Sequence, residues 1–170
     1  MNQDTADYYA CKKGDRQAAA RLYESMKNIL LTYAYGILQD RSLSEDIVHD
    51  VFTKILTEPG ARDIRDIRPY MISMARNRAK NYIRDNQQIE FVEDMERMSN
   101  ETVEDDTENE AWTMLRTLPS DEAEAVRLHI DAELTFSDIA KVMKVSVTKA
   151  FRLYRRGIKK LRECMSEERR

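Results

Sequence analysis

Two segments of the sequence carry cationic and amide side chains at helical spacing, and both suit contact with a nucleic acid. The first, residues 134–163, reads LTFSDIAKVMKVSVTKAFRLYRRGIKKLRE. Its apolar period predicts a short helix capped by Thr135, a turn at residues 144–146, and a longer helix capped by Ser146. One side of the longer helix is strongly basic, with Thr148, Arg152, Arg155, Arg156 and Lys159. Such a helix, held by a shorter one before it, suits the major groove of DNA.

The second segment, residues 69–85, reads PYMISMARNRAKNYIRD and predicts an amphipathic helix that begins at Pro69. Its expected apolar side is formed by Ile72, Ala75, Ala79, Tyr82 and Ile83. Its other side combines cations, amides and one aromatic ring, on Tyr70, Ser73, Arg76, Asn77, Lys80, Asn81 and Arg84. Cations suit phosphates, amides suit base edges, and an aromatic ring can stack an unpaired base. The simpler alternative for both basic segments is a solvated polar face.

Catalytic and metal-binding motifs are absent from the sequence. The two histidines, His49 and His129, have no second ligand at metal spacing. Cys11 and Cys164 stand alone and predict free thiols in a reducing cytoplasm. The N-terminus shows no secretory pattern, and no apolar run approaches the roughly 18 residues needed to span a membrane. We therefore expect a cytoplasmic, non-enzymatic protein with no cofactor, no bound metal and no membrane insertion.

The charge distribution divides the chain. The formal net charge is −3, which by itself argues against a nucleic-acid binder. Residues 90–110, however, hold ten acidic side chains and one basic one, so the segments on either side are both mildly basic. Local patches rather than the total decide whether DNA is attracted. The sequence predicts an N-terminal helical domain (1–89), a flexible acidic linker (90–110) and a C-terminal helix-turn-helix domain (111–170).

The fold class expected is all-α. Helices are predicted over residues 4–12, over 16–38 with Asp15 as the cap, and from Ser42 or Ser44 to about residue 56. The third of these should bury Ile47, Val48, Val51, Phe52, Ile55 and Leu56. A further helix should begin after Pro119 and pack against the helix-turn-helix.

Three stretches resemble motifs of bacterial RNA polymerase sigma factors of the extracytoplasmic-function (ECF) type, and together they cover nearly the whole chain. SEDIVHDVFTKIL (44–56) is similar to the family's polymerase-binding helix. RPYMISMARNRAKNYIRD (68–85) is similar to its promoter-melting helix. LPSDEAEAVRLHIDAELTFSDIAKVMKVS (118–146) is similar to its C-terminal domain. The order of the three, with an acidic linker between the second and third, makes the resemblance specific.

The resemblance implies a sigma factor that binds core RNA polymerase, through its β′ and β subunits, and directs it to promoter DNA. The polymerase-binding surface would include Asp46, Ile47, Val48, His49, Asp50, Val51 and Phe52. The −10 promoter element would meet Arg65, Arg68, Tyr70, Arg76, Asn77, Lys80, Asn81 and Arg84. The −35 element would meet Ser146, Val147, Thr148, Lys149, Phe151, Arg152, Arg155, Arg156 and Lys159. The resemblance also implies control by an anti-sigma protein.

Several residues depart from the family's usual pattern. His49 stands where a glutamine is usual, and Tyr70 where a tryptophan is frequent. Lys144 replaces the usual glycine of the helix-turn-helix turn, which costs energy if the turn needs a positive φ. Lys149 and Phe151 replace a threonine and a lysine. Phe151 is expected either to pack within its domain or to contact a thymine methyl group.

Two other functions fit parts of the sequence. A free-standing helix-turn-helix regulator with a sensing N-terminal domain would need a symmetric dimer and a palindromic site. Such a regulator has no use for the second basic helix at residues 69–85. An enzyme with an attached DNA-binding domain would need catalytic groups that the sequence does not show.

Overall fold

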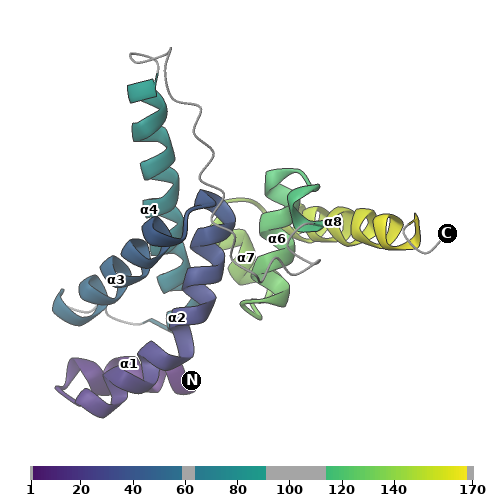
Figure 1. Cartoon of the computed structure of the whole chain (residues 1–170). Coiled ribbons are helices and arrows are strands. Elements are labelled where there is room, and N and C mark those ends of the chain that lie inside the picture. Colours follow the sequence, from purple (N-terminus) through teal and green to yellow (C-terminus); the bar gives the residue numbers. More distant parts are fainter. Residues whose placement is uncertain (1, 59–63, 91–113, 168–170) are drawn as a thin grey trace. The chain divides into compact units, whose positions relative to one another are not determined.

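The protein is built from helices in two compact units (Figure 1). The computed structural model describes residues 2–58, 64–90 and 114–167, and over these ranges it contains no strand. The predicted all-α class with two helical domains is therefore confirmed. The predicted linker lies outside the described residues, apart from Glu90 at the end of a helix. The boundaries 1–89 and 111–170 stay a prediction, and each unit is described by itself.

The N-terminal unit consists of α1 (Gln3–Lys12), α2 (Arg16–Leu38), α3 (Arg41–Thr57) and α4 (Ile67–Glu90). All four contribute fully buried side chains to its interior, among them Tyr8, Leu22, Met26, Leu30, Val51, Met71 and Ile72. Between α1 and α2, Gly14 takes φ +94°, a conformation that favours glycine. Asp15 then caps α2 as predicted, accepting hydrogen bonds from the backbone N–H groups of Gln17 and Ala18.

The start of α3 differs from the prediction. Its cap is Asp40, whose side chain accepts a hydrogen bond from the backbone N–H of Leu43 at 2.8 Å, and not Ser42 or Ser44. Ser44 is fully buried inside the helix and donates back to the carbonyl of Asp40. At the other end of α3, Leu56 was expected in the core but is 47% exposed.

The start of α4 also differs. The helix begins at Ile67 rather than Pro69, because the hydroxyl of Thr5 accepts a hydrogen bond from the backbone N–H of Ile67 at 3.0 Å. Proline is tolerated in a first turn since its missing N–H has no intrahelical partner there. The helix runs on to Glu90, beyond the predicted end at residue 85.

The C-terminal unit contains α6 (Ser120–Ile130), most of α7 (Phe136–Met143) and α8 (Val147–Glu167). Residues 114–116 form one helical turn before α6. Helix α6 buries Ala123 and Val126 against the partly buried side chains of Tyr154, Ile158 and Leu161 on α8. In the described parts of both units, no helix is long and apolar enough to cross a lipid bilayer.

Candidate nucleic-acid and partner-binding surfaces

The turn between α7 and α8 has the local geometry of a helix-turn-helix. Both predicted caps are confirmed: Thr135 Oγ1 accepts from the backbone N–H of Asp138 at 3.2 Å, and Ser146 Oγ accepts from that of Lys149 at 3.2 Å. Thr135 also donates to the Asp138 carboxylate at 2.6 Å. Lys144 takes φ +57°, so this residue does occupy the left-handed position where a glycine is favoured.

Helix α8 exposes every residue predicted for the −35 element. The exposed set consists of Ser146, Val147, Thr148, Lys149, Phe151, Arg152, Arg155, Arg156 and Lys159. Opposite them, Ala150 and Gly157 are buried. The helix therefore separates a basic surface from an apolar one, as its sequence period predicts.

An aromatic cluster supports the first turns of α8. The ring of His129 stacks on Phe136 at 4.6 Å between centroids and meets the edge of Tyr154 at 4.7 Å. Phe151 packs edge-on against Phe136 at 5.1 Å, and the guanidinium carbon of Arg155 lies 5.8 Å from the Phe151 ring. Phe151 therefore packs within its unit. Because its side chain is still 44% exposed, it also presents apolar surface beside the basic side chains.

A close approach between α6 and α8 holds the basic helix in place. At Gly157 a Cβ atom would lie 2.7 Å from Val126 Cγ2 and 3.2 Å from the carbonyl oxygen of Glu122, so only a glycine fits without movement. Beside it, the Lys160 ammonium pairs with the Glu122 carboxylate at 2.7 Å. The Glu122 side chain is only 8% exposed, which strengthens its dependence on this partner.

The predicted polymerase-binding residues of α3 fall into two sets. Asp46, His49 and Asp50 are exposed. The other predicted members are buried, namely Ile47, Val48, Val51 and Phe52. They are buried because the apolar side of α3 faces α2, where the Phe52 ring lies 4.8 Å from that of Tyr23. The side chains that α3 presents to a partner are therefore the polar ones.

Helix α4 presents much of its predicted promoter-binding set. Its exposed members are Tyr70, Asn77, Lys80, Asn81 and Arg84, and Arg65 is exposed in the segment before the helix. Arg76 is half-buried. Tyr82 was predicted on the apolar side but is 42% exposed.

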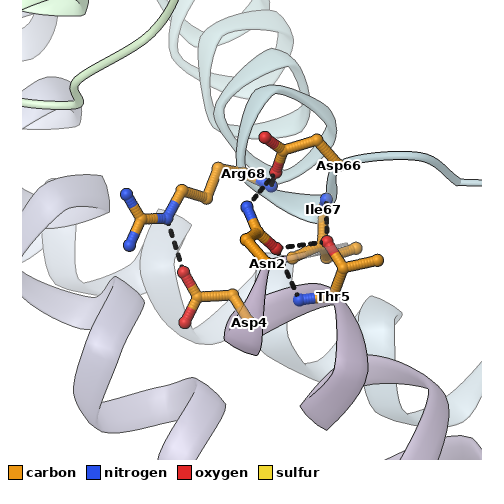
Figure 2. A network of polar contacts seen from close by, with 6 residues as sticks. All are labelled: Asn2, Asp4, Thr5, Asp66, Ile67 and Arg68. Carbon is orange, nitrogen blue, oxygen red and sulfur yellow. Dashed lines mark hydrogen bonds and ion pairs between the residues drawn. The ribbon is translucent and has the colours of Figure 1, made fainter.

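Two arginines join α4 to the rest of its unit. Arg68, predicted to meet DNA, is half-buried and donates from Nε to the carboxylate of Asp4 (Figure 2). Arg78, which the sequence did not single out, pairs with Asp50 of α3. Sequence spacing could not reveal either pair, because the partners are 64 and 28 residues apart.

Among the described residues, no three His, Cys, Asp or Glu side chains are grouped so as to hold a metal ion. The surfaces described above instead suit recognition of phosphates, bases and a protein partner.

Comparison with known proteins identifies the family. The Sigma-70 region 2 family model matches residues 22–89, and the Sigma-70, region 4 model matches residues 108–161. The region 2 match includes the second basic helix, which distinguishes this chain from a free-standing helix-turn-helix regulator. No curated protein matches the chain in sequence.

Two solved structures share the fold. CnrH, in complex with the cytosolic domain of CnrY, is 16% identical, with a TM-score of 0.68 over 98% of this chain and 99% of that chain. The sigma factor RpoE from Bartonella quintana, in complex with the anti-sigma factor NepR, is 14% identical, with a TM-score of 0.61 over 86% of this chain and 97% of that chain. With both sigma-70 regions present in order, the chain belongs to the sigma-70 family, whose members direct RNA polymerase to initiate transcription at promoters.

Proposed function

We propose that three exposed helical surfaces divide the work of this sigma factor. The exposed side of α3 binds core polymerase at β′, with further contacts to β; α4 recognises and melts the −10 element; and α8 reads the −35 element in the major groove. The observation that supports this division is selective exposure. Each helix buries most of its apolar side chains and leaves mainly polar or basic ones accessible, with Leu56, Tyr82 and Phe151 among the exposed exceptions. Because the two DNA-binding surfaces are tethered to one polymerase, weak individual contacts suffice for a stable complex.

The polymerase-binding surface is tested by reversing a charge. Asp46→Arg should abolish pull-down of core polymerase. The circular dichroism of the chain should stay helical, because the Asp46 side chain is exposed and does not contribute to the hydrophobic core. Glu24→Arg makes the same charge change at an exposed position of α2 and should retain binding. Loss of fold together with binding would instead assign Asp46 a structural role.

The −10 surface is tested by promoter opening. Changing Lys80 and Arg84 to alanine should reduce permanganate reactivity of unpaired thymines in the complex with core polymerase, because cations on this face contact the separated strands. Lys13→Ala removes an exposed cation at the end of α1 and serves as the matched control. Normal opening with reduced duplex affinity would show that α4 binds DNA without melting it.

On the −35 surface, we expect some residues to contact base edges and others to contact phosphates. Lys149 and Arg152 lie in the first turns of α8, which point into the groove when a recognition helix docks by its N-terminal end. Replacing either by alanine should relax base preference and cost about 1–3 kcal/mol. Arg155, Arg156 and Lys159 should contact phosphates, so Arg156→Ala should weaken all sequences alike and reduce the salt slope by about one. Selection from randomised upstream elements decides the assignment: an unchanged preferred sequence for Arg152→Ala would contradict it.

An anti-sigma protein is the proposed regulator, and the cytoplasm the proposed location. The support is that CnrH and RpoE are each seen with a partner, CnrY and NepR respectively, the latter an anti-sigma factor. A regulator of this kind should inhibit promoter-specific transcription in a reconstituted reaction, and excess core polymerase should restore it if both compete for α3. Inhibition that persists at any core concentration would place the regulator elsewhere on the chain.

A further inference from the structure

Helix α1 contacts the chain both just after α3 and just before the start of α4. Lys12 Nζ donates to the carbonyl of Glu58 at 2.5 Å, directly after α3. Tyr9 donates from its hydroxyl to the carbonyl of Ile64 at 3.2 Å, where the described chain resumes. Thr5 Oγ1 accepts from the backbone N–H of Ile67, the first residue of α4. These side chains, at positions 5, 9 and 12, share one face of α1.

The three contacts all go to backbone groups, namely the carbonyls of Glu58 and Ile64 and the N–H of Ile67. They therefore do not depend on which side chains these three residues carry. Thr5 links the start of α1 to the start of α4, because its hydroxyl also donates to Asn2 Oδ1 at 2.6 Å. Its side chain is fully buried. The hydrogen bond to the N–H of Ile67 satisfies one of the donors that every helix leaves unpaired at its N-terminus.

Side-chain pairs close the same network (Figure 2). Asn2 caps α1 through Oδ1, which accepts from the backbone N–H of Thr5 at 2.9 Å, and its Nδ2 donates to Asp66 Oδ1 at 2.9 Å. Asp66 Oδ1 also accepts from the backbone N–H of Arg68 at 3.0 Å. Arg68 in turn holds Asp4, which is buried. The first turns of α1 and α4 are thus capped by one shared set of groups.

We infer that α1 is a template that positions the start of α4 for promoter opening, with Thr5 and Asn2 as positioning residues. The inference rests on the proposed function of α4. The Sigma-70 region 2 match begins at residue 22, so it does not extend to α1. Arg65 and Tyr70 flank the shared network and are exposed, so the network sets where both side chains stand relative to DNA. Arg68 belongs to the network through its pair with Asp4.

Two substitutions at the buried hydroxyl test the inference in the full chain with core polymerase and promoter DNA. Thr5→Val keeps the shape and removes the hydroxyl; Thr5→Ser keeps the hydroxyl and removes a methyl group. Thr5→Val loses both hydrogen bonds of the hydroxyl, so we expect it to slow promoter opening by at least roughly threefold to tenfold, the factor for a single hydrogen bond, and Thr5→Ser to stay within about twofold. Core polymerase affinity should be unchanged in both variants, because the exposed side of α3 lies outside the network.

Asn2→Asp gives an independent test at an exposed position. The carboxylate keeps the cap of α1 but loses the donation to Asp66 and places two anions together. This variant should also open promoters more slowly at unchanged core affinity.

Three outcomes would overturn the inference in distinguishable ways. Wild-type opening rates in both Thr5→Val and Asn2→Asp would show that the network does not position α4. A matching loss of core affinity and opening would show that α1 only supports the fold. Failure of the wild-type protein to open any promoter would instead refute the proposed role of α4, on which the inference rests.

Discussion

Replacing Gly157 with alanine should push α6 and α8 apart. The added methyl group would lie 2.7 Å from Val126 Cγ2, far inside the roughly 3.5–4.0 Å that two carbon atoms prefer. Val126 is 2% exposed and β-branched, so its side chain has little freedom to move away. The backbone carbonyl of Glu122, 3.2 Å from the new atom, limits movement in a second direction.

The expected magnitude is a difference of two effects. Overpacking a well-filled interior costs about 1–3 kcal/mol. Alanine is favoured over glycine inside a helix by about 1 kcal/mol. Gly157→Ala should therefore lower the free energy of unfolding by up to about 2 kcal/mol. In a Val126→Ala background the clash with Cγ2 is gone, and the same substitution should become neutral or stabilising.

Amide hydrogen exchange of the full chain measures this effect locally. Peptides from α6 and α8 should lose protection in Gly157→Ala, while peptides from α2, in the other unit, provide the internal reference. Binding to duplex DNA that carries the upstream element should weaken in parallel, because α8 moves on its support. An equal change in protection in the wild-type and Val126→Ala backgrounds would refute the steric argument, since the clash has a named partner.

Two further predictions concern stability. The hydrogen bond from Arg21 keeps the pKa of Asp7 below its ordinary value despite burial, so the pair stabilises the fold above about pH 4 and stops doing so as the pH falls through the lowered pKa. Melting temperatures of Asp7→Asn should lie below those of the wild type at neutral pH and converge with them in acid; a constant difference would contradict this. Lys144→Gly should raise the free energy of unfolding by about 1 kcal/mol, because φ +57° strains a residue with a side chain. Lys141→Gly, inside α7, should lower it by about the same amount; equal losses at both positions would refute the strain.

Caps that depend on neighbours in sequence were predictable. Asp15, Thr135 and Ser146 each accept a hydrogen bond from a backbone N–H two or three residues ahead. The cap of α3 was not predicted because three cap-forming residues, Asp40, Ser42 and Ser44, occur within residues 40–44. Burial of Ser44 decides among them, and burial depends on how α3 packs.

The basic face of α8 was predictable from the helical period alone, and all its predicted residues are exposed. Contacts between segments far apart in the sequence were not predictable. The start of α4 is set by Thr5, whose partner is 62 residues away. The Arg68–Asp4 and Arg78–Asp50 pairs could not be predicted either, because their partners lie on different helices. The contact of Arg68 with DNA, which the family resemblance implies, stays a prediction.

The aromatic cluster around His129 allows the two helical units to be followed separately by proton NMR without isotope labelling. The sequence holds only two histidines, one in each helical unit. His49 is exposed, whereas the His129 ring stacks on Phe136 and meets the edge of Tyr154, so ring currents must displace its proton resonances. If the His129 chemical shifts lost this displacement while those of His49 stayed the same, the helix-turn-helix alone would have been disrupted. Line broadening of the His49 resonance on addition of core polymerase would report engagement of the other unit in the same spectrum.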